Sequence, residues 1–337
     1  MASGSASPVV LVTGATGAVG PALVDRLLDD GYRVRVFNRR PDHEMWGDRV
    51  SVHRGDLLDS SAVRGAVSGV DAVFHLAALL HVSNPPAALG AEYDRVNIAG
   101  TRAIVDASVS AGVKRIILFS TIAVYGSTRG RVVDETSLPQ PDTHYGSSKL
   151  AAESIVLAQR SPDGAPLGTI LRLASVYGPR LKGNYEQLVR ALSQHRFVPL
   201  GRGVNRRTLV FDSDVAAAAV AVLRSSVAAG RTYNVTDNGF HPMRDIVAAI
   251  CGALERQPPR LYLPAAPARA AAAMIEAAAR TAGIRPPIQR ATIEKYLEDV
   301  AVRGSLITAE VGWTPRVDLA SGWKETVRSM KLAGSLA

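Results

Sequence analysis

A glycine-rich segment at residues 13–20, TGATGAVG, constrains the fold of this chain more than any other feature. The apolar run Val9–Thr13 precedes it, and leucines at helical spacing follow it in Ala22–Asp30, a helix that Gly31 is expected to end. A glycine turn from a strand into a helix lets the backbone approach a diphosphate, which the N–H groups of the helix N-terminus then bind. The alternative is a strand–helix turn with no ligand. The residues expected to contact a dinucleotide here are Gly14, Thr16, Gly17, Ala18, Val19 and Gly20.

The first half of the chain alternates short apolar runs with helical stretches. This alternation predicts an α/β fold, a doubly wound parallel sheet of Rossmann type with helices on both faces. Further strands are expected at Arg33–Phe37, Val50–His53, Val70–Leu76, Arg115–Phe119, Gly168–Leu173 and Thr232–Val235. Helices are expected at Ser60–Val67, Tyr93–Ala111, Tyr145–Gln159 and Val215–Leu223. We expect residues 1–172 to form a dinucleotide-binding domain, to which 206–236 return, and residues 173–205 and 237–337 to form a smaller substrate-binding region.

The composition narrows the class of protein. The 337 residues are 47% hydrophobic and 20% charged, which is typical of a folded globular chain. The single cysteine, Cys251, excludes a disulfide framework and a cysteine-based zinc site. The net charge of +9 suits anionic partners, but the arginines are scattered and only 5% of the residues are aromatic, which argues against nucleic acid. Residues 1–7 do not resemble a signal peptide and no tract is long and apolar enough to span a bilayer, so we expect a cytoplasmic protein without stable membrane insertion.

The end of the second expected strand bears on the choice between NAD and NADP. An acidic residue about 20 positions after the glycine segment would bind the ribose of NAD, but Asn38 stands there. Arg39 and Arg40 follow, and a guanidinium can hold the 2′-phosphate of NADP. These residues favour NADP; the alternative is that Asn38 serves NAD while both arginines face solvent. Asp56 and Leu57, after the third strand, are expected to flank the adenine.

Tyr145 and Lys149 stand four residues apart at the start of a helical stretch and therefore share one helix face. The pKa of a phenol is ordinarily about 10, and a nearby ammonium lowers it by favouring the phenolate. We predict that Lys149 lowers the pKa of Tyr145 and also holds a cofactor ribose. Tyr145 can then move a proton to or from a secondary alcohol or ketone during hydride transfer.

Several short segments occur in a fixed order with these features. They are TGATGAVG at 13–20, Asp56-Leu57, HLAA at 75–78, Asn97, FSTIAVYG at 119–126, YGSSK at 145–149, VYGP at 176–179 and VGWTP at 311–315. With this set, about residues 8–330 of the chain resemble an extended short-chain dehydrogenase/reductase of the NAD(P)-dependent epimerase/dehydratase family. Within that family the chain resembles nucleotide-sugar 4-epimerases and 4-keto-sugar reductases.

The resemblance implies roles for the catalytic residues. Thr121 occupies the catalytic Ser/Thr position and hydrogen-bonds the reacting oxygen, with Ser120 as the alternative and as a cofactor contact. Asn97 falls where the family has an asparagine that interrupts a helix and orders a water and Lys149. The alternative for Asn97 is a position on a helix surface.

The resemblance also implies cofactor contacts and an assembly. Ala77 and Ala78 line the cofactor diphosphate and ribose, and Val176 lies beside the nicotinamide. A homodimer is expected through a bundle that contains Tyr93–Ala111 and Tyr145–Gln159. No metal site is expected, because the histidines lack ligand partners at workable spacing.

The substrate residues are carried over in the same way. In nucleotide-sugar members an arginine seven residues before an aspartate grips the diphosphate, and Arg207 stands seven before Asp214. The alternative is that Arg207 packs against an acidic surface residue. Tyr185 is expected to border the uridine or thymidine of a UDP- or TDP-sugar, and the loop Leu79–Gly90 to border the sugar. Ser175 is expected near the diphosphate, where nucleotide-sugar members often have asparagine.

Three functions remain open from the sequence. The first is 4-epimerisation or 4-keto reduction of a nucleotide-diphosphate sugar, in which an epimerase retains its cofactor and a reductase consumes NADPH. The second is NADPH-dependent reduction of a lipophilic ketone of steroid, flavonoid or polyketide type, which Ser175 also suits. The third is a non-catalytic NAD(P)-binding protein, against which Thr121, Tyr145 and Lys149 argue. A dehydratase is disfavoured because Ile122-Ala123 replace the family's Asp-Glu pair.

An alanine-rich stretch at Ala270–Ala279 belongs to none of these motifs. We expect it to be a core helix of the smaller region. The alternative is a helix that touches a membrane or a lipid substrate.

Overall fold

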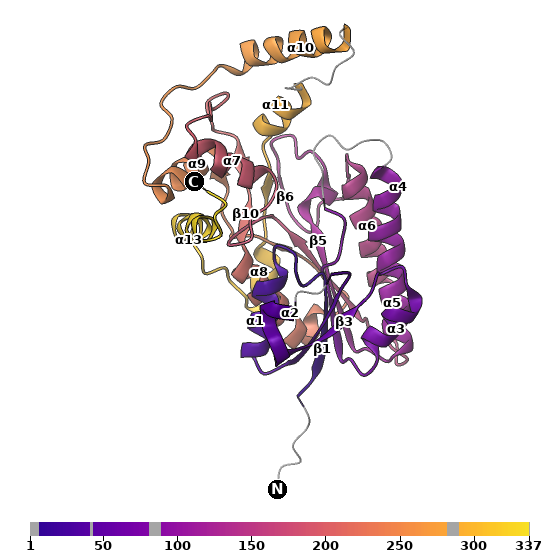
Figure 1. The fold of residues 1–337 in the computed structure, drawn as a ribbon. Coiled ribbons are helices and arrows are strands. Elements are labelled where there is room, and N and C mark those ends of the chain that lie inside the picture. The colour runs from indigo at the N-terminus through magenta and orange to yellow at the C-terminus, as the bar shows by residue number, and fades with distance from the viewer. Residues whose placement is uncertain (1–6, 41–42, 81–88, 282–289, 337) are drawn as a thin grey trace.

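A seven-stranded parallel sheet forms the centre of the molecule (Figure 1). The computed structural model describes residues 7–40, 43–80, 89–281 and 290–336. The strands lie in the order β11-β7-β5-β4-β1-β2-β3, and every neighbouring pair is parallel. Their bounds are β1 Val9–Thr13, β2 Arg33–Asn38, β3 Val50–Arg54, β4 Ala72–His75, β5 Arg115–Thr121, β7 Gly168–Leu173 and β11 Thr232–Val235. The order reverses between β1 and β4, where sheets of this kind open a crevice for a ligand.

Helices cover both faces of the sheet, which confirms the predicted doubly wound α/β fold. Leu23 and Val215, from two helices on one face, belong to one buried cluster, and Ile104 and Val156 belong to a second cluster on the other face. Figure 1 shows the two layers on opposite sides of the strands. The helices are α1 Gly20–Asp29, α8 Asp212–Arg224 and α12 Ser305–Val311 on the first face, and α3 Ser60–Val67, α5 Gly100–Ser110 and α6 His144–Leu157 on the second.

The structure confirms most of the predicted elements and divides one of them. β1, β7, β11 and α3 have the predicted bounds. The helix predicted at Tyr93–Ala111 consists of α4 (Leu89–Tyr93), a π-helical segment η2 (Asp94–Ala99) and α5. A π-helical turn inserts an extra residue into a helix and is frequent at functional sites.

A smaller region packs around the buried indole of Trp323. Its ring stacks on Tyr177 with 4.8 Å between ring centroids. The elements of this region are β8 Ser175–Tyr177, which pairs in parallel with β10 Leu209–Phe211, and the helices α7 Asn184–Ser193, α9 Met243–Ala253 and α13 Leu319–Leu332. The domain boundary at residue 172 stays a prediction.

Short elements complete the described chain. The short helices are α2 His43–Trp46, η1 Gly47–Arg49, η3 Ile122–Tyr125 and η4 Ser226–Ala228. Two-residue strands pair as β6 Val132–Val133 with β13 Ala301–Val302, and as β9 Arg206–Arg207 with β12 His241–Pro242. In the described residues, no helix is long and apolar enough to cross a membrane.

The alanine-rich stretch lies in α10 (Ala265–Thr281), and the prediction that it is a core helix is wrong. Between residues 265 and 279 only Ala272 and Ala279 are buried. The helix stands at the carboxyl end of the strands beside α11 (Arg290–Leu297), away from the main body (Figure 1). Alanine methyl groups satisfy an apolar pattern without specifying what they pack against, so sequence alone could not place this helix.

Candidate active site

Two glycines shape the turn between β1 and α1. Gly14 has a φ of +70°, and a Cβ added there would lie 2.7 Å from the backbone nitrogen of Ala77. A Cβ added at Gly20 would lie 2.0 Å from the carbonyl oxygen of Ala15, so only glycine lets α1 begin this close to the turn. The backbone N–H of Ala77 also donates to the hydroxyl of Thr13 at 3.2 Å. The ends of β1 and β4 are therefore held together on one side of the crevice.

His75, the last residue of β4, is buried beneath this turn. One ring nitrogen lies 2.7 Å from the hydroxyl of Thr13 and the other 3.1 Å from the hydroxyl of Thr101. Burial, helped by the charge of Lys149, lowers the pKa of His75 to about 3. His75 is thus a neutral structural residue whose two ring nitrogens are both engaged.

The ends of β2 and β3 present the residues predicted to meet the adenosine half of a dinucleotide. Asn38 is buried, and its side-chain nitrogen has no hydrogen-bond partner among the described residues. Arg39 and Arg40 are exposed next to it. The Gly55 N–H donates to the Asn38 carbonyl at 3.2 Å, which joins the ends of β3 and β2. Of the two residues that follow, Asp56 is exposed and Leu57 is buried. This edge therefore offers a buried amide donor and two exposed guanidinium groups.

These features fit a nicotinamide dinucleotide. The first turn of α1 has no side-chain cap, so its N–H groups remain available to a phosphate. The glycine turn leaves room for a diphosphate, and the unpartnered Asn38 amide suits a ribose or adenine acceptor. The residues nearest that diphosphate would be those of the turn, Gly14, Thr16, Gly17, Ala18 and Val19, together with Ala77 and Ala78 after β4.

Thr121 and Tyr145 meet at the carboxyl end of β5. Their side chains share a hydrogen bond, and the Thr121 hydroxyl also accepts from the Ala123 N–H at 3.2 Å. Gly146 explains the close approach of α6 to this strand, since a Cβ there would lie 2.8 Å from the carbonyl oxygen of Ala123. The two hydroxyl groups predicted to act on one substrate oxygen are therefore adjacent.

The predicted effect of Lys149 on Tyr145 is wrong for this structure. Burial raises the pKa of Tyr145 to about 12, although the Thr121 hydrogen bond opposes that rise. Lys149 is itself buried, which lowers its own pKa to about 8. The phenol is thus protonated at neutral pH, because desolvation outweighs the hydrogen bond with Thr121.

Asn97 lies in the π-helical segment η2 and is buried, so its alternative placement on a helix surface is wrong. Its side-chain oxygen accepts from the Leu79 N–H at 2.7 Å, and its nitrogen donates to the Leu79 carbonyl at 3.2 Å. The same nitrogen donates to the Ser148 hydroxyl at 3.0 Å. Asn97 therefore joins the strand-end loop to α6 one residue before Lys149.

A buried ion pair between α6 and β7 was not predicted. Arg172 of β7 donates to Glu153 of α6, with a shortest distance of 2.7 Å, and to the Tyr125 hydroxyl at 3.0 Å. Ser120 donates to Glu153 at 2.5 Å, so its side chain points to this pair. Glu153 stands four residues after Lys149 and raises its pKa against the effect of burial. The spacing along α6 was visible in the sequence, but nothing there pointed to Arg172.

Two of the residues that we predicted to bind the substrate, Arg207 and Tyr185, lie near each other. The guanidinium of Arg207 lowers the otherwise raised pKa of Tyr185, so the two side chains lie within electrostatic reach. One Arg207 nitrogen donates to the carbonyls of Lys295 and Tyr296 at the end of α11, at 2.6 and 3.0 Å. The alternative, in which Arg207 packs against an acidic surface residue, is not observed among the described ion pairs; it is the neighbouring Arg206 that pairs with an acidic residue.

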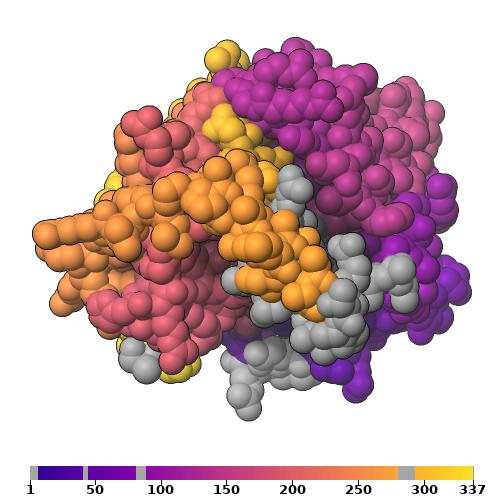
Figure 2. Space-filling view, turned by 90° about the horizontal axis from the view of Figure 1, so that it is seen from above, coloured from indigo at the N-terminus to yellow at the C-terminus, as the bar shows by residue number. Residues whose placement is uncertain are grey.

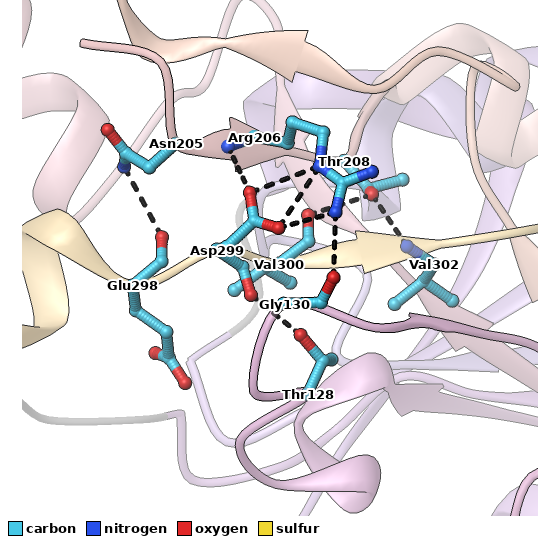
Figure 3. Close-up of polar contacts among 9 residues, drawn as sticks. All are labelled: Thr128, Gly130, Asn205, Arg206, Thr208, Glu298, Asp299, Val300 and Val302. Atoms are coloured by element: carbon cyan, nitrogen blue, oxygen red, sulfur yellow. Dashed lines mark hydrogen bonds and ion pairs between the residues drawn. The ribbon is translucent and has the colours of Figure 1, made fainter. Parts of the chain in front are cut away.

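Arg206 ties this segment to the residues after α11. Its guanidinium pairs with Asp299, and the shortest distance is 2.6 Å. Figure 3 shows this pair together with the Thr208 hydroxyl between Val300 and Val302. Arg206 therefore has a structural role in its ion pair with Asp299, and Arg207 is the arginine that lies close to Tyr185.

The other predicted substrate and cofactor contacts lie in β8. Ser175 is exposed and pairs with Leu209 of β10, and Val176 is half-buried and pairs with Val210. Residues 81–88, most of the loop predicted to border the sugar, lie outside the described residues.

The curated proteins that are similar to this chain include the following two. One is an uncharacterized protein, y4nG, of Sinorhizobium fredii, 34% identical over 244 residues that cover 71% of this chain and 59% of that protein. The other is the N-acetyl-alpha-D-glucosaminyl-diphospho-ditrans,octacis-undecaprenol 4-epimerase of Escherichia coli O157:H7. It is 30% identical over 76% of this chain and 75% of its own length.

A solved structure and a family model agree with these similarities. MoeE5 in complex with UDP-glucuronic acid and NAD superimposes with a TM-score of 0.73 at 27% identity, covering 96% of this chain and 99% of that chain. The model of the NAD dependent epimerase/dehydratase family matches residues 10–236. That match runs from the first strand of the sheet to the last and contains the turn, Thr121, Tyr145 and Lys149. The chain therefore belongs to the NAD dependent epimerase/dehydratase family of enzymes.

Proposed function

We propose that this enzyme transfers a hydride between NAD or NADP and a secondary alcohol or ketone of a diphosphate-linked sugar, by 4-epimerisation or 4-keto reduction. The observation that carries this proposal is the hydrogen bond between Thr121 and Tyr145, at the strand end beside the dinucleotide turn. Two adjacent hydroxyl groups can hold one substrate oxygen and pass a proton to or from it.

In this mechanism Tyr145 is the acid or base and Thr121 orients the reacting oxygen. A nicotinamide cofactor bound at the glycine turn would supply the hydride acceptor or donor, and Tyr145 would take up or supply the matching proton. Because burial keeps Tyr145 protonated at neutral pH, the structure is poised to donate a proton to a ketone oxygen. In the direction of alcohol oxidation, positive charge beside the phenol would have to lower its pKa first. Lys149, buried on the same helix, would supply that charge when protonated and hold the cofactor ribose.

Arg207 and Tyr185 support a substrate that carries a diphosphate. A guanidinium binds phosphate oxygens in pairs, and an aromatic ring beside it can border a nucleoside base. The similar structure of MoeE5 contains UDP-glucuronic acid and NAD. A UDP- or TDP-sugar is therefore our first candidate.

A diphosphate sugar linked to a lipid is the second candidate. The exposed apolar helix α10 joins α11, whose terminal carbonyls bind Arg207. The similar protein of Escherichia coli O157:H7 is named for a sugar diphosphate linked to undecaprenol. Turnover of a lipid-linked sugar but not of free UDP- or TDP-sugars would favour this candidate over the first. Turnover of a steroid or polyketide ketone alone would replace both.

The cofactor identity tests the mode of reaction. We propose NADP, because Arg39 and Arg40 are exposed beside Asn38. Purified protein is denatured and any released nucleotide is identified by mass spectrometry. Near-stoichiometric NAD would favour an epimerase and assign both arginines to the surface, whereas NADP, or an empty site that prefers NADPH on titration, would favour a reductase.

A homodimer is also proposed, through the exposed side of η2 and α5. This side has a shallow hollow of about 560 Å³. The residues lining it are Asp94, Ile98, Ala99, Arg102, Ala103 and Asp106. A molar mass from light scattering that equals one chain would refute the dimer.

Replacing Tyr145 with phenylalanine tests the mechanism itself. Y145F removes the proton-transferring hydroxyl and keeps the ring, which packs 5.8 Å from that of Tyr93. We expect kcat to fall about 10²- to 10⁴-fold while cofactor binding and the melting temperature are retained. Turnover at the rate of the unmodified enzyme would reject Tyr145 as the acid or base.

A further inference from the structure

Between residues 265 and 279, the exposed side of α10 is apolar. Between residues 265 and 279 the charged residues Arg269 and Glu276 and the two buried alanines share one side of the helix. The opposite side carries the exposed residues Ala266, Pro267, Ala270, Ala271, Ala273, Met274, Ala277 and Ala278, which we call the α10 face. A surface helix of a globular protein normally shows the reverse arrangement, with its apolar stripe inward.

An ion pair fixes this orientation of the helix. The Arg269 guanidinium binds both carboxylate oxygens of Glu294 in α11, at 2.8 and 3.0 Å. The charged side of α10 is therefore the side that faces α11, and the apolar side is turned to the surroundings. Met274 is 68% exposed at the centre of that side.

A second apolar edge lies at the beginning of α10. Leu261 and Leu263 are 73% and 45% exposed, and the backbone of Leu263 exchanges hydrogen bonds with Pro199 and Gly201 at 2.9 and 2.8 Å. This pairing places Val198, which is 49% exposed, beside the two leucines. Large exposed aliphatic side chains from two segments thus lie next to one another just before α10 begins.

Basic residues surround this edge. Arg196, Arg202 and Arg260 are exposed, and none forms an ion pair with any residue in the described part of the chain. Residues 195–204 and 255–276 together contain five arginines and two glutamates. An apolar surface with a rim of unpaired arginines matches the interface of an anionic bilayer, where aliphatic groups enter the headgroup region and guanidinium groups meet phosphates.

We propose that the α10 face, with Val198, Leu261 and Leu263, rests on an anionic lipid surface. Figure 2, the view onto the carboxyl end of the strands, shows α10 and α11 across this side of the molecule, between the early and late halves of the chain. A lipid surface at this position lies over the carboxyl end of the strands, where Thr121 meets Tyr145 of α6. The inference goes beyond the proposed reaction and does not depend on it.

A second copy of the chain is a poorer occupant. The α10 face consists of small methyl groups and one methionine, and it lacks the aromatic anchors of stable protein interfaces. A symmetric pairing would also bring Arg196, Arg202 and Arg260 toward their copies, and like charges across an interface disfavour association.

Vesicle sedimentation of the full chain tests the proposal. We expect binding to phosphatidylcholine vesicles that contain about 30% phosphatidylglycerol, weak binding to phosphatidylcholine alone, and release as salt rises. The double variant L261D/M274D should bind at least about 5-fold less, because it puts two carboxylates against the anionic surface. The matched control is V227D. Val227 is 59% exposed in η4, at the opposite end of the sheet, and its replacement should leave binding unchanged.

Three results would overturn the proposal. They are equal binding to both vesicle types, no binding to either, and unchanged binding of L261D/M274D. Light scattering distinguishes a lipid surface from a second copy of the chain as the occupant of the α10 face. A lower molar mass of L261D/M274D than of V227D would assign the face to a second copy. Circular dichroism and cofactor titration of each variant confirm that the fold is retained.

Discussion

The surroundings of α6 and the helix α10 differ in what they bury. Charged groups are buried behind α6, whereas apolar groups are exposed on α10. Behind α6, Glu153 and Arg172 are buried and bound to each other, and Lys149 is buried one turn away. In α10 the methyl groups face outward and the ion pair of Arg269 is half-exposed. A buried charge must be held by partners in a fixed geometry, whereas an exposed apolar face calls for a partner that the described residues do not supply. The first region therefore holds its side chains in a fixed geometry, and the second is the surface that we propose meets a partner.

The sharpest test of this comparison removes one arginine from each region. R172M leaves the Glu153 carboxylate buried without its partner, and we expect it to lower the free energy of unfolding by about 3–5 kcal/mol. R269M removes an ion pair whose side chains are 41% and 46% exposed. We expect it to lower the free energy of unfolding by less than about 1 kcal/mol. Urea unfolding followed by circular dichroism measures both.

The double variant R172M/E153L separates the lost partner from lost packing. It should recover much of the stability lost in R172M, because no charge is then left buried. Equal losses in R172M and R269M would contradict the contrast between the two regions.

A second pair of variants compares backbone space. G20A places a methyl group against the carbonyl of Ala15, and we expect a loss of about 1–3 kcal/mol together with weaker cofactor binding. G252A adds the same group in α9, where nothing lies within 4 Å, and should raise stability by about 0.5–1 kcal/mol. Thermal melts and cofactor titration distinguish the two, and an unaffected G20A protein would show that the turn relaxes.

The pH dependence of His75 follows from its burial. Its folded pKa of about 3 lies below the ordinary value of 6.5, so the unfolded chain binds a proton between these values and the folded chain does not. Stability from this residue is present above pH 6.5 and falls as the pH falls toward 3, by about 2 kcal/mol between pH 7 and 5. Unfolding curves of H75N should lack this component; identical pH slopes in H75N and the unmodified protein would show that His75 is protonated in the fold.

His241 in the smaller region should show the opposite and smaller dependence. Its ring lies 2.7 Å from Asp237, and this hydrogen bond raises the pKa of the histidine. Its stabilising effect is therefore complete below pH 6.5 and disappears as the pH rises through the raised pKa. H241Q should lower the free energy of unfolding by less than about 1 kcal/mol at pH 6, and by less still at pH 8. Urea unfolding of H241Q and of the unmodified protein at the two pH values measures this difference. A larger loss of stability from H241Q at pH 8 than at pH 6 would reverse the assignment.

The sequence was sufficient for features that depend on neighbours along the chain. The glycine turn, the strands β1, β7 and β11, and the pair Tyr145 and Lys149 each rest on residues within a few positions of one another. Their local spacing dictates backbone geometry or a shared helix face directly. The strand–helix alternation also predicted a doubly wound parallel sheet, because right-handed crossovers leave few arrangements, but it did not assign the order of the strands.

The sequence was insufficient where distant segments set the outcome. The pKa of Tyr145 depends on how deeply several elements bury it, and spacing from Lys149 could not reveal that. The partner of Arg207 is the end of α11, about ninety residues later in the chain. The exposure of α10 depends on what fails to pack against it, which no periodicity within the helix encodes.

The position of β11 bears on the order in which the chain can fold during synthesis. β7 ends at Leu173, but the strand that covers its free edge begins at Thr232. At typical ribosomal rates of about 5–20 residues per second, that edge waits roughly 3–12 seconds for its neighbour. An uncovered strand edge is a template for pairing with other chains, so this interval is when a nascent molecule is most open to aggregation and to a chaperone.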